Sequence, residues 1–150
     1  MEKAKNELLI LGNNSTLDDL VSVLKTFKDE HLSARYKGSR TIAEILQHIH
    51  CSQNCMYLND FIMNNKRNCE CNAPKTIKEA ISNIEEMKSY FTQIIKELNE
   101  TDFKKEFTTE WGQDLTKEKA LFQSITHTSY HLSEICFIAG LNNFYQGTLG

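Results

Sequence analysis

The chain has 150 residues, of which 25% are charged, and a formal net charge of -3, a size and balance typical of one globular domain. No basic stripe indicates a nucleic-acid surface, no apolar run is long enough to span a bilayer, and the first residues lack a signal-peptide pattern. We therefore predict one soluble, cytoplasmic domain over residues 1–150 that binds neither nucleic acid nor membrane.

The scarcity of helix breakers favours long helices, since the chain has one proline and six glycines. The five cysteines are odd in number and lack regular spacing, which favours free thiols in a reducing compartment. Cys69 and Cys71 have the spacing of half a metal site. Because no second pair stands at a known spacing, we interpret them as ordinary loop thiols.

Hydrophobic residues recur at helical spacing in four segments. Residues 1–14 show little pattern and end at Gly12-Asn13-Asn14, so we expect an arm or a short lead-in helix there. The four predicted helices span residues 16–32, 41–63, 76–99 and 116–141. These lengths predict an all-α four-helix bundle. The first and third connections between the helices look longer than a minimal antiparallel turn, which leaves the up-down order open.

Capping residues support the starts of two helices. Thr41 is followed three residues later by Glu44, the spacing of a capping box, and Thr76 is followed in the same way by Glu79. The connection after residue 102 contains Trp111-Gly112, a turn signal. We expect Trp111 to plug one end of the bundle or to border a ligand.

The last predicted helix carries His127 and His131. A helix turns once per 3.6 residues, so these two lie about 40° apart on one face, with Glu134 about 20° from His127. Two imidazoles so placed can bind one metal ion. The spacing alone does not establish a metal site, because a third ligand has to come from elsewhere in the chain.

The second predicted helix offers two more histidines. His48 and His50 lie about 200° apart, so both cannot face one site, and geometry alone does not choose between them. His48 shares its side of the helix with Cys55. We expect His31, near the end of the first predicted helix, to be a surface residue favoured by the helix dipole.

Two stretches together, TIAEILQHI at 41–49 and HTSYHLSEI at 127–135, resemble the DinB/YfiT-like family of metal-binding four-helix proteins. The resemblance covers almost the whole chain. It implies that the first metal ligand is His48, in a Leu-x-His-Ile stretch, and that His127 and His131 are the second and third.

One pair of positions departs from that family. Many relatives follow the last histidine with Gly-Gln after one intervening residue, where this chain has Ser133 and Glu134. Glu134 either orients a ligand histidine, alters the charge at the metal, or is an ordinary exposed carboxylate. His50 has no counterpart in the family and is expected at the surface.

The resemblance implies a divalent ion, zinc or nickel, held by three neutral imidazoles with an open coordination position. Members of the family include S-transferases that use a small bacterial thiol and a thiol-dependent isomerase. The implied reaction is attack of a metal-bound thiolate on an electrophilic small molecule, and a homodimer is left open. Glu134, Tyr130 and Trp111 are candidates for roles beside the metal or in the pocket. Cys55 is another, although a buried structural cysteine is favoured.

Two other classes of protein fit the same pattern: a non-catalytic, stress-related metal-binding or interaction protein, and a plain helical bundle with core histidines. A site open to solvent beside the metal favours an enzyme, whereas a capped site with four protein ligands favours a structural or sensing role.

Overall fold

The structure, a computed structural model, describes residues 2–65 and 69–145. The long elements are α1 (Glu2–Leu24), α2 (Ile42–Cys51), its direct continuation as the π-helix η2 (Ser52–Ile62), α3 (Ile77–Glu97) and α5 (Lys117–Leu141). The short elements are the 3-10 helix η1 (Asp29–Ser33), α4 (Glu100–Lys104), and the strands β1 (Glu106–Thr108) and β2 (Asp114–Thr116). Within the described ranges, no helix is both long and apolar enough to cross a membrane.

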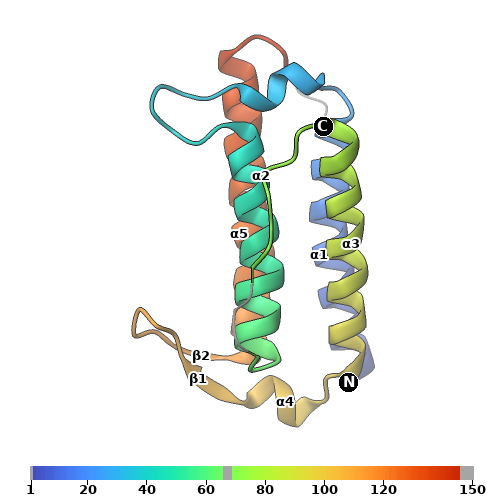
Figure 1. Cartoon of the computed structure of the whole chain (residues 1–150). Coiled ribbons are helices and arrows are strands. Elements are labelled where there is room, and N and C mark those ends of the chain that lie inside the picture. Colours follow the sequence, from blue (N-terminus) through green and yellow to red (C-terminus); the bar gives the residue numbers. More distant parts are fainter. Residues whose placement is uncertain (1, 66–68, 146–150) are drawn as a thin grey trace.

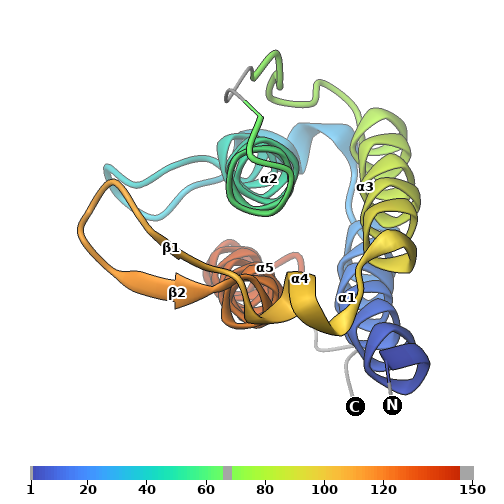
Figure 2. The ribbon, with the colours of Figure 1, turned by 90° about the horizontal axis from the view of Figure 1, so that it is seen from below.

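The four long helical segments form the predicted all-α bundle. Segment α1 packs against α3 and α5, and the α2–η2 segment packs against α5 and α3. Figure 1 shows that α1 and α5 run in one direction while α2 and α3 run in the other. Seen along the bundle axis in Figure 2, α2 lies beside α5, and α3 lies beside α1.

Because α2–η2 and α3 run in the same direction, the connection between them has to return along the length of the bundle. Figure 1 shows this connection passing beside α2. The α2–η2 segment holds 10 and 11 residues in its two parts, about 30 Å of helix. The chain from Ile62 to Ile77 can extend to roughly 50 Å, so it is long enough. The predicted polar loop at 64–75 is therefore a crossover.

Three helices match the sequence prediction to within about two residues, and the two predicted caps form as expected. The Thr41 hydroxyl accepts from the Glu44 amide at 3.1 Å, and the Glu44 carboxylate accepts from the Thr41 amide at 2.8 Å. The Thr76 hydroxyl likewise accepts from the Glu79 amide at 3.1 Å. The connection after α3 forms α4 and an antiparallel β1–β2 hairpin, with Gly112 at a positive φ of 85° in its turn.

The first helix was predicted wrongly. It begins at Glu2, ends at Leu24 instead of residue 32, and continues through Gly12-Asn13-Asn14. Asn13 is buried and accepts a hydrogen bond of 3.0 Å from the Gln53 side chain of η2. A partner on another helix therefore accommodates a residue that, by local preference, would end a helix.

We predict that Gln53→Ala lowers the free energy of unfolding by about 1–3 kcal/mol. The substitution leaves the buried side-chain oxygen of Asn13 without the hydrogen bond that Gln53 donates to it. Urea denaturation measures this loss. Gln93→Ala, at an exposed position of α3, is the matched control and should change little. Equal effects of the two substitutions would show that the Asn13–Gln53 pair does not stabilise the helix contact.

Candidate metal centre

The contact between α2 and α5 brings three histidines together. His48 comes from α2, and His127 and His131 come from successive turns of α5. The Nε2 atom of His127 lies 3.1 Å from Nε2 of His48 and 3.2 Å from Nε2 of His131. The three side chains each offer a ligand atom within 4.8 Å of the others. The structure thus groups the three histidines that the family resemblance implied as ligands.

These separations fit a single small ion. With metal–nitrogen bonds of about 2.1 Å, ligand nitrogens lie about 3.0 Å apart at right angles and about 3.4 Å apart at tetrahedral angles. The observed 3.1 and 3.2 Å fall between these limits. The donor set therefore suits a divalent metal held on one side by three imidazoles.

Glu134 fixes the orientation of one of the three rings. Its carboxylate oxygen lies 2.9 Å from Nδ1 of His131, and a carboxylate can only accept a hydrogen bond. The proton of His131 is therefore on Nδ1, and the lone pair of Nε2 is directed toward the other two histidines. Of the interpretations offered for Glu134, the contact favours orientation of a ligand histidine.

Two of the imidazoles are held in the neutral form that metal binding requires. Burial lowers the pKa of His48 to about 4, and the nearby charges of Arg40, His131 and His127 add to the effect. Burial also lowers the pKa of His127 to about 4, helped by His131 and Arg40. Sequence patterns gave no indication of a role for Arg40, whose positive charge lowers the pKa of both rings.

The group is partly open to solvent. His48 and His127 are half-buried and His131 is 7% exposed. Among the described residues, no fourth His, Cys, Asp or Glu joins them. Three protein ligands with an accessible side are typical of a catalytic metal site, whereas structural sites have four ligands and are closed.

Comparison with known proteins agrees with this geometry. The family model of the DinB superfamily matches residues 14–135. The chain belongs to the DinB superfamily. No curated protein matches the sequence.

Two solved structures show the same DinB-like fold. A DinB-like protein from Bacillus cereus ATCC 10987 superposes with a TM-score of 0.72 at 15% identity, over 90% of this chain and 91% of that one. YfiT from Bacillus subtilis, described as a probable metal-dependent hydrolase with an unusual four-helix bundle topology, gives a TM-score of 0.70 at 18% identity, over 95% and 88%.

Aromatic rings border the histidines of this DinB-superfamily protein. The exposed Tyr130 ring lies 5.1 Å from the His131 ring. The buried Tyr57 ring lies 6.1 Å from the His127 ring, and the sequence gave no sign of it. Trp111 is half-exposed in the hairpin and lies 5.8 Å from Phe61. It has no ring contact with the three histidines, so a direct role at the metal is not supported.

A cavity of ≈ 730 Å³ lies beside the hairpin, away from the histidines themselves, and is lined in part by Phe61, Phe107 and Lys117. The Phe61 ring contacts Tyr57 at 5.5 Å, and Tyr57 in turn contacts His127. This row of rings connects the histidine group with the cavity.

The remaining candidate residues lie elsewhere. His50 is half-buried beside Pro74 and α3 and not at the surface as predicted. His31 is also half-buried and stacks on Phe144 with 4.0 Å between ring centres. Cys55 groups with three other cysteines instead of the histidines, and burial together with the neighbouring Cys69 raises the pKa of its thiol.

We predict that Glu134→Ala weakens zinc binding by about 10- to 100-fold, the usual cost of removing a group that orients a ligand histidine. Glu134→Gln should bind nearly as tightly as the unmodified protein, because the amide oxygen still accepts from His131 Nδ1. Competition titration with a zinc chelator measures both affinities. Glu97→Ala, on the exposed face of α3, is the control, and a loss in that variant as large as in Glu134→Ala would contradict the orienting role.

Proposed function

We propose that this protein is a metal-dependent enzyme in which His48, His127 and His131 hold one divalent ion, zinc or nickel, and which transfers a small thiol to an electrophilic substrate. The observation that carries the proposal is the convergence of three imidazole Nε2 atoms on one point, with His48 and His127 only half-buried. A fourth protein ligand, expected for a purely structural site, does not join them among the described residues.

An ion bound there supplies positive charge that favours a thiolate over a thiol. The protein residues supply position and surroundings. Glu134 holds the His131 ring in place. Tyr130 and Tyr57 border the histidines with aromatic surface, and Arg40 provides a positive potential that suits a thiol or electrophile carrying a carboxylate or phosphate.

Hydrolysis is a second candidate reaction, because YfiT, which shares this fold, is described as a probable metal-dependent hydrolase. The same three-histidine arrangement can serve water as well as a thiol, since a bound divalent ion acidifies either. The non-catalytic alternative is less well supported, because the histidine group has three members, two of which are only half-buried.

Incubation of the zinc- or nickel-loaded protein with a panel of small thiols and an alkylating electrophile tests the reaction. Mass spectrometry should show a thioether formed faster than in the buffer control. The chelated protein and His127→Ala should fall to the buffer rate, whereas His31→Gln, outside the group, should retain activity. Metal-dependent cleavage of ester or amide substrates without any thiol would contradict transfer in favour of hydrolysis. Inactivity of the loaded protein in both assays would contradict an enzyme.

A further inference from the structure

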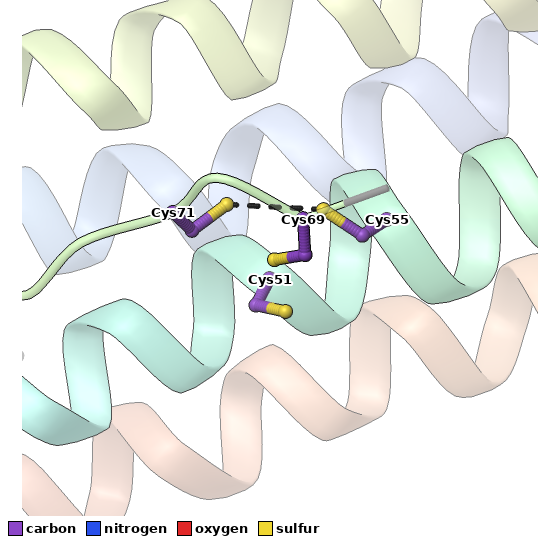
Figure 3. A group of neighbouring side chains, drawn as sticks. All are labelled: Cys51, Cys55, Cys69 and Cys71. Atoms are coloured by element: carbon purple, nitrogen blue, oxygen red, sulfur yellow. Dashed lines mark hydrogen bonds between the residues drawn. The ribbon is translucent and has the colours of Figure 1, made fainter. Parts of the chain in front are cut away.

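A second cluster of potential metal ligands lies where the crossover passes α2 and η2. Cys51 is the last residue of α2 and Cys55 lies in the first half of η2, while Cys69 and Cys71 belong to the crossover. Figure 3 shows the two helical cysteines and the two crossover cysteines gathered in one place. The four sulfur atoms lie within 4.8 Å of one another.

The spacing of these sulfurs fits a single ion. Cys55 Sγ lies 3.8 Å from Cys71 Sγ. With zinc–sulfur bonds of about 2.3 Å, the edge of a tetrahedron of ligands is about 3.8 Å. A disulfide would bring two sulfurs to about 2.05 Å and leave the other two unused. An iron–sulfur cluster places several of its own atoms between the ligand cysteines and needs more space.

Three of the four thiols are at least partly shielded from solvent. Burial raises the pKa of the Cys55 and Cys71 thiols, whereas hydrogen bonds from the neighbouring thiols and the Cys71 backbone lower the pKa of Cys69 against the opposing effect of burial. Cys55 is 4% exposed, and Cys51 and Cys71 are half-buried. Because a bound metal ion deprotonates its cysteine ligands, an ion at this cluster would supply the positive charge that the partly buried thiolates need.

We propose that Cys51, Cys55, Cys69 and Cys71 form a second metal site, separate from the three histidines, which binds one thiophilic divalent ion such as zinc. Four protein ligands close the coordination sphere, which is the pattern of a structural site. Two of them belong to the helix and two to the crossover, so the ion fastens the returning chain to α2–η2. The Gln47 side chain reinforces this attachment by donating to the Cys71 carbonyl at 2.8 Å.

The position of the site links it to the histidine group. Cys51 follows His48 by three residues on the same helix. Because binding to the folded state adds directly to folding free energy, the ion also stabilises the segment that presents His48. The proposed cysteine site does not depend on the activity proposed above, because it involves no residue of the histidine group.

Metal titration of the full chain, freshly reduced with a phosphine and stripped of metal, tests the proposal. With Zn²⁺ alone, native mass spectrometry should show two ions per chain. With Co²⁺ alone, the spectrum should contain the strong sulfur-to-cobalt charge-transfer absorption that cysteine ligands produce and histidines do not. Cys69→Ser with Cys71→Ser should lose this absorption and one ion. Cys136→Ser, a thiol outside the cluster, should retain both.

The histidine variants separate this site from the first one. His127→Ala should keep the charge-transfer absorption and lose the other ion, so failure of one site leaves the other measurable. If the double cysteine variant does not fold, as judged by circular dichroism, Cys69→Ser alone replaces it, since Cys69 is exposed. The proposal is overturned if cobalt gives no sulfur-to-metal absorption in the unmodified protein. It is equally overturned if that absorption survives in the folded cysteine variants.

Discussion

The packing of α2 against α5 is the contact on which the proposed metal centre depends, because it places Nε2 of His127 3.1 Å from Nε2 of His48 and 3.2 Å from Nε2 of His131. Three imidazole nitrogens this close together cannot all form hydrogen bonds with one another. Glu134 holds the proton of His131 on Nδ1, and burial lowers the pKa of His48 and His127, so neutral imidazoles are favoured around this shared point. Arrangements of this kind persist where the surrounding fold imposes them and are commonly functional. A divalent cation removes the conflict.

The crossover is the second constraint, and it explains why one helix carries both clusters. Since α2 and α3 run in the same direction, the chain has to return beside α2 (Figure 1), where Cys69 and Cys71 meet Cys51 and Cys55 (Figure 3). The helix changes from α to π at Ser52, between these two helical cysteines, and π segments are frequent at functional sites. The face of α2 toward α5 thus contributes His48 to the histidine group, while Cys51 and Cys55 lie beside the returning chain.

Local sequence signals were sufficient to predict the features that depend on residues close together in the chain. The Thr41 and Thr76 caps, the lengths of α2–η2, α3 and α5, and the shared face of His127 and His131 follow from them. The choice of His48 over His50 needed the family resemblance. Features set by tertiary contacts were missed: Asn13 remains helical only because Gln53 reaches it. The cysteine cluster likewise depends on a crossover whose path no spacing rule encodes.

Zinc binding by three single-histidine variants, measured as stoichiometry and thermal midpoint with and without chelator, tests the central claim most directly. His48→Ala and His127→Ala should each lose the ion of the histidine group and the part of the thermal midpoint that chelator removes. His50→Ala, two residues from His48 but packed toward α3, should bind as the unmodified protein does. If His48→Ala holds zinc as tightly as the unmodified protein, or His50→Ala loses it instead, the three-histidine centre is wrong.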